Sequence, residues 1–262
     1  MSFEELKQRQ SRMWGNGPYQ RITETITDIH ERVVERLAPE PGDRWLDLAT
    51  GTGAVAERAA ERGATVTGVD LAPDLIATAG ERASARGLEI DYVVGDAERL
   101  EFEDGSFGKV SSTCGIMFTP DHESSARELA RVTAPGGRIA LANWTPTGGL
   151  AKMFAVMAPY QPAAPPSSPF AWGDRGRVEE LLGESFELEL EEHTSTLRIE
   201  SGEAYWELFS TCYGPTKTLA ESIGERREDL RRDWIEFFET NYADDGEIVH
   251  TREYLLIHGT RR

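Results

Sequence analysis

The chain has 262 residues, with 28 lysines and arginines against 46 aspartates and glutamates, so its formal net charge is −18. This charge disfavours nucleic acid or an anionic membrane surface as a partner, because both would repel it. Two cysteines are too few for a disulfide framework or a cysteine-rich zinc site. Met1–Lys7 lacks the basic start and apolar run of a signal peptide. We therefore expect a cytoplasmic protein. We expect no metal site, because no cluster of histidine, cysteine, aspartate or glutamate residues has the spacing of metal ligands.

The first half of the chain alternates between helical and strand patterns. Apolar residues recur every three or four positions from Ile22 to Leu37, which predicts an amphipathic helix that Pro39 ends. The predicted strands that follow are 44–49, 65–69, 90–94, 109–113 and 138–143, and the helices between them are 54–62, 72–86 and 121–132. This alternation predicts a mostly parallel sheet covered on both faces, which binds ligands at the carboxyl ends of its strands.

The pattern changes after Trp144. Five prolines between Gly148 and Gly173 predict an irregular, stiff connection. Residues 186–199 and 247–260 predict two further strands, and residues 202–222 and 225–242 predict helices between them.

A glycine turn, Gly51-Thr-Gly53, joins the first of these strands to the next helix. Alone it matches the loose fingerprint of nicotinamide-binding folds, or an ordinary turn that needs glycine for its backbone angles. Asp47 precedes it. A carboxylate there would repel a pyrophosphate, but it suits a ligand that carries an ammonium and a sulfonium.

Two further acids end the next two strands. Asp70 follows the second strand, where a carboxylate can accept two hydrogen bonds from a ribose diol. Asp96, followed by Glu98, ends the third strand, where it can take the exocyclic amine of an adenine. Acids on three successive strand ends favour a cationic nucleoside over a dinucleotide.

These motifs resemble the class I S-adenosylmethionine-dependent methyltransferases, in particular the quinone-biosynthesis and small-molecule methyltransferases. The similarity runs from Asp43 to Trp144 and includes Arg131–Arg138. Ser106-Phe107-Gly108 departs from the family, which usually has Phe-Asp there, but that aspartate is mostly structural. The resemblance implies a Rossmann-like, doubly wound, mostly parallel seven-stranded sheet, with an N-terminal helical lid and a helical insertion between the last strands.

The resemblance also implies a domain plan and a cofactor. One methyltransferase domain would span 1–262, with a lid at 1–40, a cofactor-binding core at 41–144, an acceptor-side elaboration at 145–246 and a final strand at 247–262. The cofactor would be S-adenosylmethionine and the product S-adenosylhomocysteine. The implied cofactor residues are Trp14 and Tyr19 in the lid region, Asp47, the backbone of Ala49, Gly51 and Gly53 beside the methionine, Asp70 and Leu71 at the ribose and adenine, Asp96, Ala97 and Glu98 at the adenine edge, and Thr113.

Catalysis requires few dedicated residues, because methyl transfer from a sulfonium is an in-line displacement that depends on alignment and on exclusion of water. His122 follows the fourth strand and could deprotonate a hydroxyl acceptor. Alternatively, Asp121 caps a helix and His122 is an exposed residue of its first turn.

Aromatic residues in the second half predict an apolar acceptor pocket, or else core packing. The candidates are Trp144, Tyr160, Trp172, Trp206 and Tyr213. We expect O-methylation of a small molecule by a monomer or homodimer, with nitrogen, carbon and sulfur acceptors left open. The alternatives are a cofactor-binding sensor or scaffold that no longer transfers, and a nicotinamide-dependent oxidoreductase, which Asp47 and Asp96 disfavour.

Overall fold

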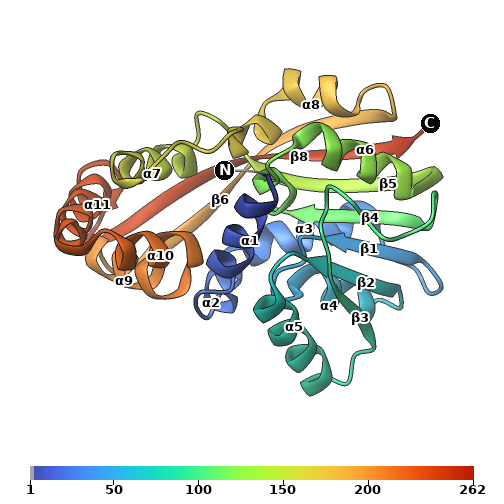
Figure 1. Ribbon diagram of the computed structural model, residues 1–262, viewed down its shortest axis with the longest axis horizontal. Helices are drawn as coiled ribbons and strands as arrows, with labels where there is room; N and C mark the ends of the chain where they lie inside the picture. The colour runs from blue at the N-terminus through green and yellow to red at the C-terminus, as the bar shows by residue number, and fades with distance from the viewer. Residues whose placement is uncertain (1–2) are drawn as a thin grey trace.

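The computed structural model describes residues 3–262 and is built around one mixed sheet (Figure 1). The strand order is β3-β2-β1-β4-β5-β8-β6, with the short β7 paired to β8. The strands from β1 to β5 pair in parallel, whereas β8 runs antiparallel to both of its long neighbours. The strands are β1 (Arg44–Leu48), β2 (Thr65–Asp70), β3 (Ile90–Val94), β4 (Phe107–Thr113), β5 (Thr133–Trp144), β6 (Phe186–Ile199), β7 (Ala243–Asp244) and β8 (Glu247–Arg261).

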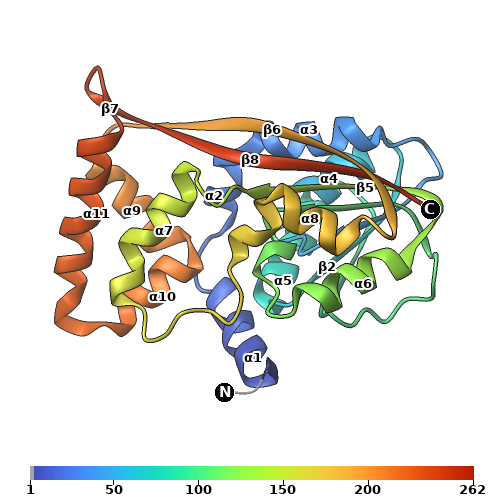
Figure 2. The same cartoon turned by 90° about the horizontal axis from the view of Figure 1, so that it is seen from above.

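Helices cover both faces of this sheet, as the alternating pattern predicts. Figure 2 shows α3 (Thr27–Leu37) and α4 (Ala54–Glu61) on one side, and α6 (His122–Val132) and α8 (Arg175–Leu182) on the other. Because both faces are covered, β1 buries apolar side chains on each of them, and Trp45, Leu46 and Leu48 are fully buried. The predicted mostly parallel α/β fold is confirmed.

The sheet has eight strands rather than the predicted seven. The added strand is β7, two residues that pair with the start of β8. Asp245 and Gly246 form the turn between them, with φ of +47° and +85°. Asp-Gly is a preferred pair for two-residue hairpin turns because both positions require positive φ. The sequence contains this signal, but Asp245-Gly246 lies between the predicted helix 225–242 and the predicted strand 247–260, so it was expected to be a simple connection.

Two helices that the sequence predicts as continuous are divided into shorter segments in the structure. The predicted 22–37 helix is three segments, α2 (Gln20–Thr23), the 3-10 turn η1 (Glu24–Ile26) and α3. The predicted 202–222 helix is α9 (Gly202–Cys212) and α10 (Gly214–Ser222), separated at the extended Tyr213. The others are α1 (Phe3–Trp14), α5 (Pro73–Ala85) and α11 (Arg227–Asn241), with short 3-10 turns η2 (Ile116–Phe118) and η5 (Gly224–Arg226).

The Pro-rich connection is more ordered than predicted. It contains a nine-residue helix, α7 (Gly149–Met157), and two 3-10 turns, η3 (Ala158–Tyr160) and η4 (Pro169–Gly173). The prediction of an irregular segment was wrong for α7 because that helix ends before the first of the prolines. Helix α8 follows without having been predicted, and the Asp174 side chain caps it by accepting from the Arg177 amide.

Helices α7, α9, α10 and α11 gather at the far end of β6 and β8, beyond the parallel strands (Figures 1 and 2). Aromatic rings fill the space between them, with Tyr205 and Phe238 centroids 4.1 Å apart and Trp206 and Trp234 centroids 5.9 Å apart. Within residues 3–262, no helix is long and apolar enough to cross a membrane.

Two buried histidines make stability depend on pH. His30 is 4 % exposed and His250 is fully buried, and burial together with nearby arginines lowers the pKa of each to about 3. The unfolded chain protonates them near pH 6.5, so their contribution to stability is lost as the pH falls below that value, by about 1.4 kcal/mol per unit for each. Asp47 opposes this, because burial raises its pKa to about 6.

We therefore expect the free energy of unfolding to fall by about 2 kcal/mol between pH 6.5 and pH 5. Urea denaturation at the two pH values measures this difference. The substitution His30→Leu should make the loss smaller. Equal or greater stability at pH 5 in the wild type would contradict the assignment of neutral, buried histidines.

Candidate functional site

The loop between β1 and α4 has an unusual backbone. Ala49, Gly51 and Gly53 all have positive φ, at +51°, +57° and +83°. At Gly53 a side chain is also excluded by space, because an ideal Cβ would lie 2.2 Å from the Tyr92 hydroxyl oxygen. The glycine at this position is therefore required by both conformation and packing.

The Asp70 carboxylate joins this loop to the end of β2. It accepts hydrogen bonds from the Gly51 amide at 2.8 Å and from the Ala72 amide at 2.9 Å. Asp70 is 8 % exposed, and burial raises its pKa although the backbone amides act in the opposite direction. Each oxygen keeps a lone pair, so the carboxylate can still accept from a ligand.

Asp47 is held more tightly by the protein than the sequence suggested. Its carboxylate accepts from the hydroxyls of Thr50 and Ser111, both at 2.6 Å. The residue is 2 % exposed, and burial raises its pKa to about 6. Asp47 therefore fixes the loop against β4, and it also lines the adjoining cavity.

A cavity lies at the carboxyl ends of the parallel strands, under α1. It brings together most of the predicted cofactor residues: Trp14, Tyr19, Asp47, Ala49, Gly51, Asp70, Leu71, Asp96, Ala97 and Thr113. Gly53 and Glu98 lie just outside its lining, the first behind the loop and the second in an ion pair. Cys114 and Gly115 close it from β4, where an ideal Cβ on Gly115 would lie 2.5 Å from that of Ala49.

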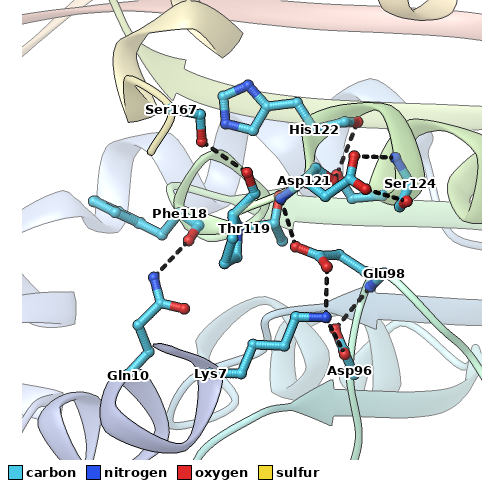
Figure 3. Close-up of polar contacts among 12 residues, drawn as sticks. Lys7, Gln10, Asp96, Glu98, Phe118, Thr119, Asp121, His122, Ser124 and Ser167 are labelled. Atoms are coloured by element: carbon cyan, nitrogen blue, oxygen red, sulfur yellow. Dashed lines mark hydrogen bonds and ion pairs between the residues drawn. The ribbon is translucent and has the colours of Figure 1, made fainter. Parts of the chain in front are cut away.

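Helix α1 forms the roof of the cavity, with Lys7, Gln10 and Trp14 in its lining. Figure 3 shows Lys7 and Gln10 extending from this helix towards Asp96 and Phe118. The Lys7 ammonium lies 2.7 Å from the Asp96 carboxylate and 2.5 Å from that of Glu98. The Gln10 side chain donates to the Phe118 carbonyl oxygen at 3.0 Å. These contacts tie the roof to the ends of β3 and β4.

The end of α1 is held on the opposite side by α10. Asn16 donates to the Thr218 hydroxyl at 3.0 Å and accepts from the Lys217 ammonium at 2.6 Å. Gly214 allows the closest approach, because an ideal Cβ there would lie 2.1 Å from the Met13 carbonyl oxygen. The N-terminal segment is thus docked on both sides of the cavity.

The His122 ring lies outside the cavity. Figure 3 shows it directed away from Lys7 and Asp96, and its centroid is 6.0 Å from that of Trp172. His122 is 3 % exposed, and burial lowers its pKa. Asp121 caps α6 by accepting from the Ser124 amide at 2.9 Å. Asp121 therefore caps the helix, as the alternative interpretation predicts, although His122 is buried rather than exposed. The role of His122 as a base stays a prediction, and this geometry does not favour it.

None of the five aromatic residues expected in the acceptor pocket lines this cavity. They are at most 6 % exposed and pack in the interior: Trp144, Tyr160, Trp172, Trp206 and Tyr213. Tyr213 comes nearest, because its ring contacts those of Trp14 and Tyr19 at centroid distances of 5.7 and 6.1 Å. Their assignment to acceptor binding stays a prediction.

Several lining residues were missed by the sequence analysis. Lys7 and Gln10 come from α1, and Thr23, Ile26 and His30 share one face of the broken N-terminal helix. The available signal was the histidine within an otherwise apolar stripe at helical spacing. No sequence signal pointed to Lys7, because its acidic partners lie 89 and 91 positions away.

The strand order, the glycine loop and the cavity at the strand ends together define a protein of the Rossmann-like α/β class. Residues 46–141 match the family model described as a methyltransferase domain. The uncharacterized protein Rv1405c of Mycobacterium tuberculosis is 35 % identical over 261 residues, covering 95 % of this chain and 93 % of that protein.

One further relative matches less than half of this chain, and one solved structure is similar in fold at low sequence identity. The demethylmenaquinone methyltransferase of Thermus thermophilus is 43 % identical over 117 residues, which are 44 % of this chain and 53 % of that enzyme. The crystal structure of the YcgJ protein from Bacillus subtilis has a TM-score of 0.64 at 18 % identity, covering 89 % of this chain and 97 % of that one. The chain belongs to the class I S-adenosylmethionine-dependent methyltransferases.

Removing the Asp70 carboxylate should weaken cofactor binding. Asp70→Ala removes a buried acceptor of charged hydrogen bonds, each contributing about 1.5–3 kcal/mol, so we expect S-adenosylmethionine to bind roughly tenfold to a hundredfold more weakly. Calorimetry measures the affinity, and a thermal melt checks that the variant is folded. Unchanged affinity would contradict this assignment of Asp70.

Removing the Lys7 ion pairs should loosen helix α1, which forms the roof of the cavity. Lys7→Gln removes the cation from two acids, so we expect faster hydrogen exchange in α1 and weaker binding of S-adenosylhomocysteine by several-fold. Arg9→Gln is the matched control, because Arg9 is exposed on the same helix. If the two variants behave alike, the ion pair does not hold the roof.

Proposed function

We propose that this enzyme transfers the methyl group of S-adenosylmethionine to an oxygen atom of a small apolar or aromatic molecule, and that the cavity under α1 holds the cofactor. The observation that carries this proposal is the charge of the cavity. Asp47, Asp70 and Asp96 line it, and Lys7 is the only lysine or arginine among its described lining residues. Lys7 is already paired with Asp96 and Glu98.

Such a cavity favours a cationic ligand. Burial raises the pKa of both Asp47 and Asp70, which means that their charged forms lack compensation from a nearby cation. An ammonium or sulfonium would supply it. A pyrophosphate would instead add negative charge, so a dinucleotide fits these residues poorly.

Specific residues would hold the parts of the cofactor. Asp70 keeps lone pairs for a ribose diol, and Leu71 beside it offers an apolar surface to the base. Asp96 accepts from the Glu98 amide and from Lys7, so it would share its carboxylate with the adenine amine. The backbone of Ala49 and Gly51, both at positive φ, would lie along the methionine moiety.

The bound cofactor supplies an activated methyl group on a sulfonium. The chain's contribution is to hold the acceptor in line with that group and to exclude water. Helix α1 covers the cavity and performs the second task. Trp14, Tyr19 and Phe118 present aromatic surface to it, which suits a sulfonium because ring faces attract cations.

The same rings support an apolar or aromatic acceptor. With no lysine or arginine other than Lys7 among the described lining residues, an acceptor that carries phosphate or carboxylate would lack a partner. A single methyltransferase domain over 1–262, a cytoplasmic location and a monomeric or homodimeric state remain part of this proposal.

The test is a screen of acceptors in which release of S-adenosylhomocysteine is measured. Phenols and hydroquinones should support turnover, while their O-methylated forms and phosphorylated analogues should not. Product analysis identifies the methylated atom. Turnover with amines, thiols or carbon acceptors alone would contradict transfer to oxygen, and failure to bind S-adenosylmethionine would contradict the cofactor assignment.

A further inference from the structure

His30 occupies an unusual position at the base of the cavity. It is the fourth residue of α3 and lies one turn after Ile26, which lines the same cavity. Ala54 and Val55, the first two residues of α4, complete this part of the lining. His30 is 4 % exposed, so the cavity is where its ring can meet a ligand.

The His30 ring has no hydrogen-bond partner among residues 3–262. His30 lines the cavity, and its ring nitrogens are not fully sealed from it by neighbouring side chains. His250, the other deeply buried histidine, differs because its Nδ1 lies 2.7 Å from the Tyr205 hydroxyl. A ring nitrogen that lines a cavity and has no protein partner is available to hydrogen-bond a ligand.

The surroundings of His30 suit an anion, unlike the rest of the cavity. The start of α4 presents amide groups that have no partners within the helix, at its positive end. Arg58 lies near enough to lower the pKa of His30 further, after burial, to about 3. Glu31, the next residue of α3, is engaged elsewhere, because it pairs with Arg58 at 2.6 Å.

We propose that His30, as a neutral imidazole, donates a hydrogen bond to the carboxylate of the cofactor's methionine moiety. This inference rests on the proposed cofactor site. The methionine tail is a zwitterion, and the cavity offers each of its charges a different partner. The ammonium has Asp47 and Asp70 beside the glycine loop, and the carboxylate has His30 and the first turn of α4. His30 is thus a cofactor-binding residue rather than a proton acceptor from the substrate.

Two ligands separate this role from a structural one. S-adenosylhomocysteine carries the carboxylate, whereas 5′-methylthioadenosine has the same adenosine and sulfur but no amino-acid tail. In His30→Leu we expect the dissociation constant of S-adenosylhomocysteine to rise about tenfold to a hundredfold, while that of 5′-methylthioadenosine changes less than about twofold. Calorimetry on the full chain measures both. His30→Asn, which retains an N–H donor, should recover part of the affinity.

The controls keep the outcomes distinct. His250→Leu removes a buried histidine outside the cavity lining and should leave the ratio of the two dissociation constants unchanged. If His30→Leu unfolds, His30→Phe keeps the ring volume and allows the same comparison. Equal weakening of both ligands, or no change in either, would overturn the role of His30. A wild-type protein that binds neither ligand would overturn the proposed function itself.

Discussion

The hydrogen bonds from two backbone amides to the buried Asp70 carboxylate fix the geometry on which the site depends. They connect the loop after β1 with the end of β2, so that neighbouring strand ends form one surface. Asp47 adds the connection to β4 through Ser111. The loop therefore needs no ligand to define its shape. A site assembled in this way is preorganised, and binding costs little conformational entropy.

The core of the fold and the acids of the site could be predicted because their signals are local. Each strand from β1 to β5 is a short apolar run next to its own turn residues, and the carboxylates follow those strands directly. Parallel pairing then brings Asp47, Asp70 and Asp96 to one edge without further information. Gly51 and Gly53 could be placed for the same reason.

What could not be predicted depends on contacts distant in sequence or on competing local signals. Lys7 finds its acids only after the sheet has assembled. The break at Ile26 divides a stripe that is continuous in the sequence. The aromatic residues after Trp144 satisfy a pattern common to a core and a binding pocket. Only the packed structure shows that most of them face one another.

The docking of the N-terminal segment also constrains the order in which the protein can be completed. Asn16 precedes its partners on α10 by about 200 positions in the chain. Closing so long a loop is slow and follows the formation of local structure. The sheet and its glycine loop can form earlier, so the nascent chain would pass through a stage with an open, acidic cleft. During synthesis the roof is then the last part of the site to form, although its residues come before those of the sheet in the chain.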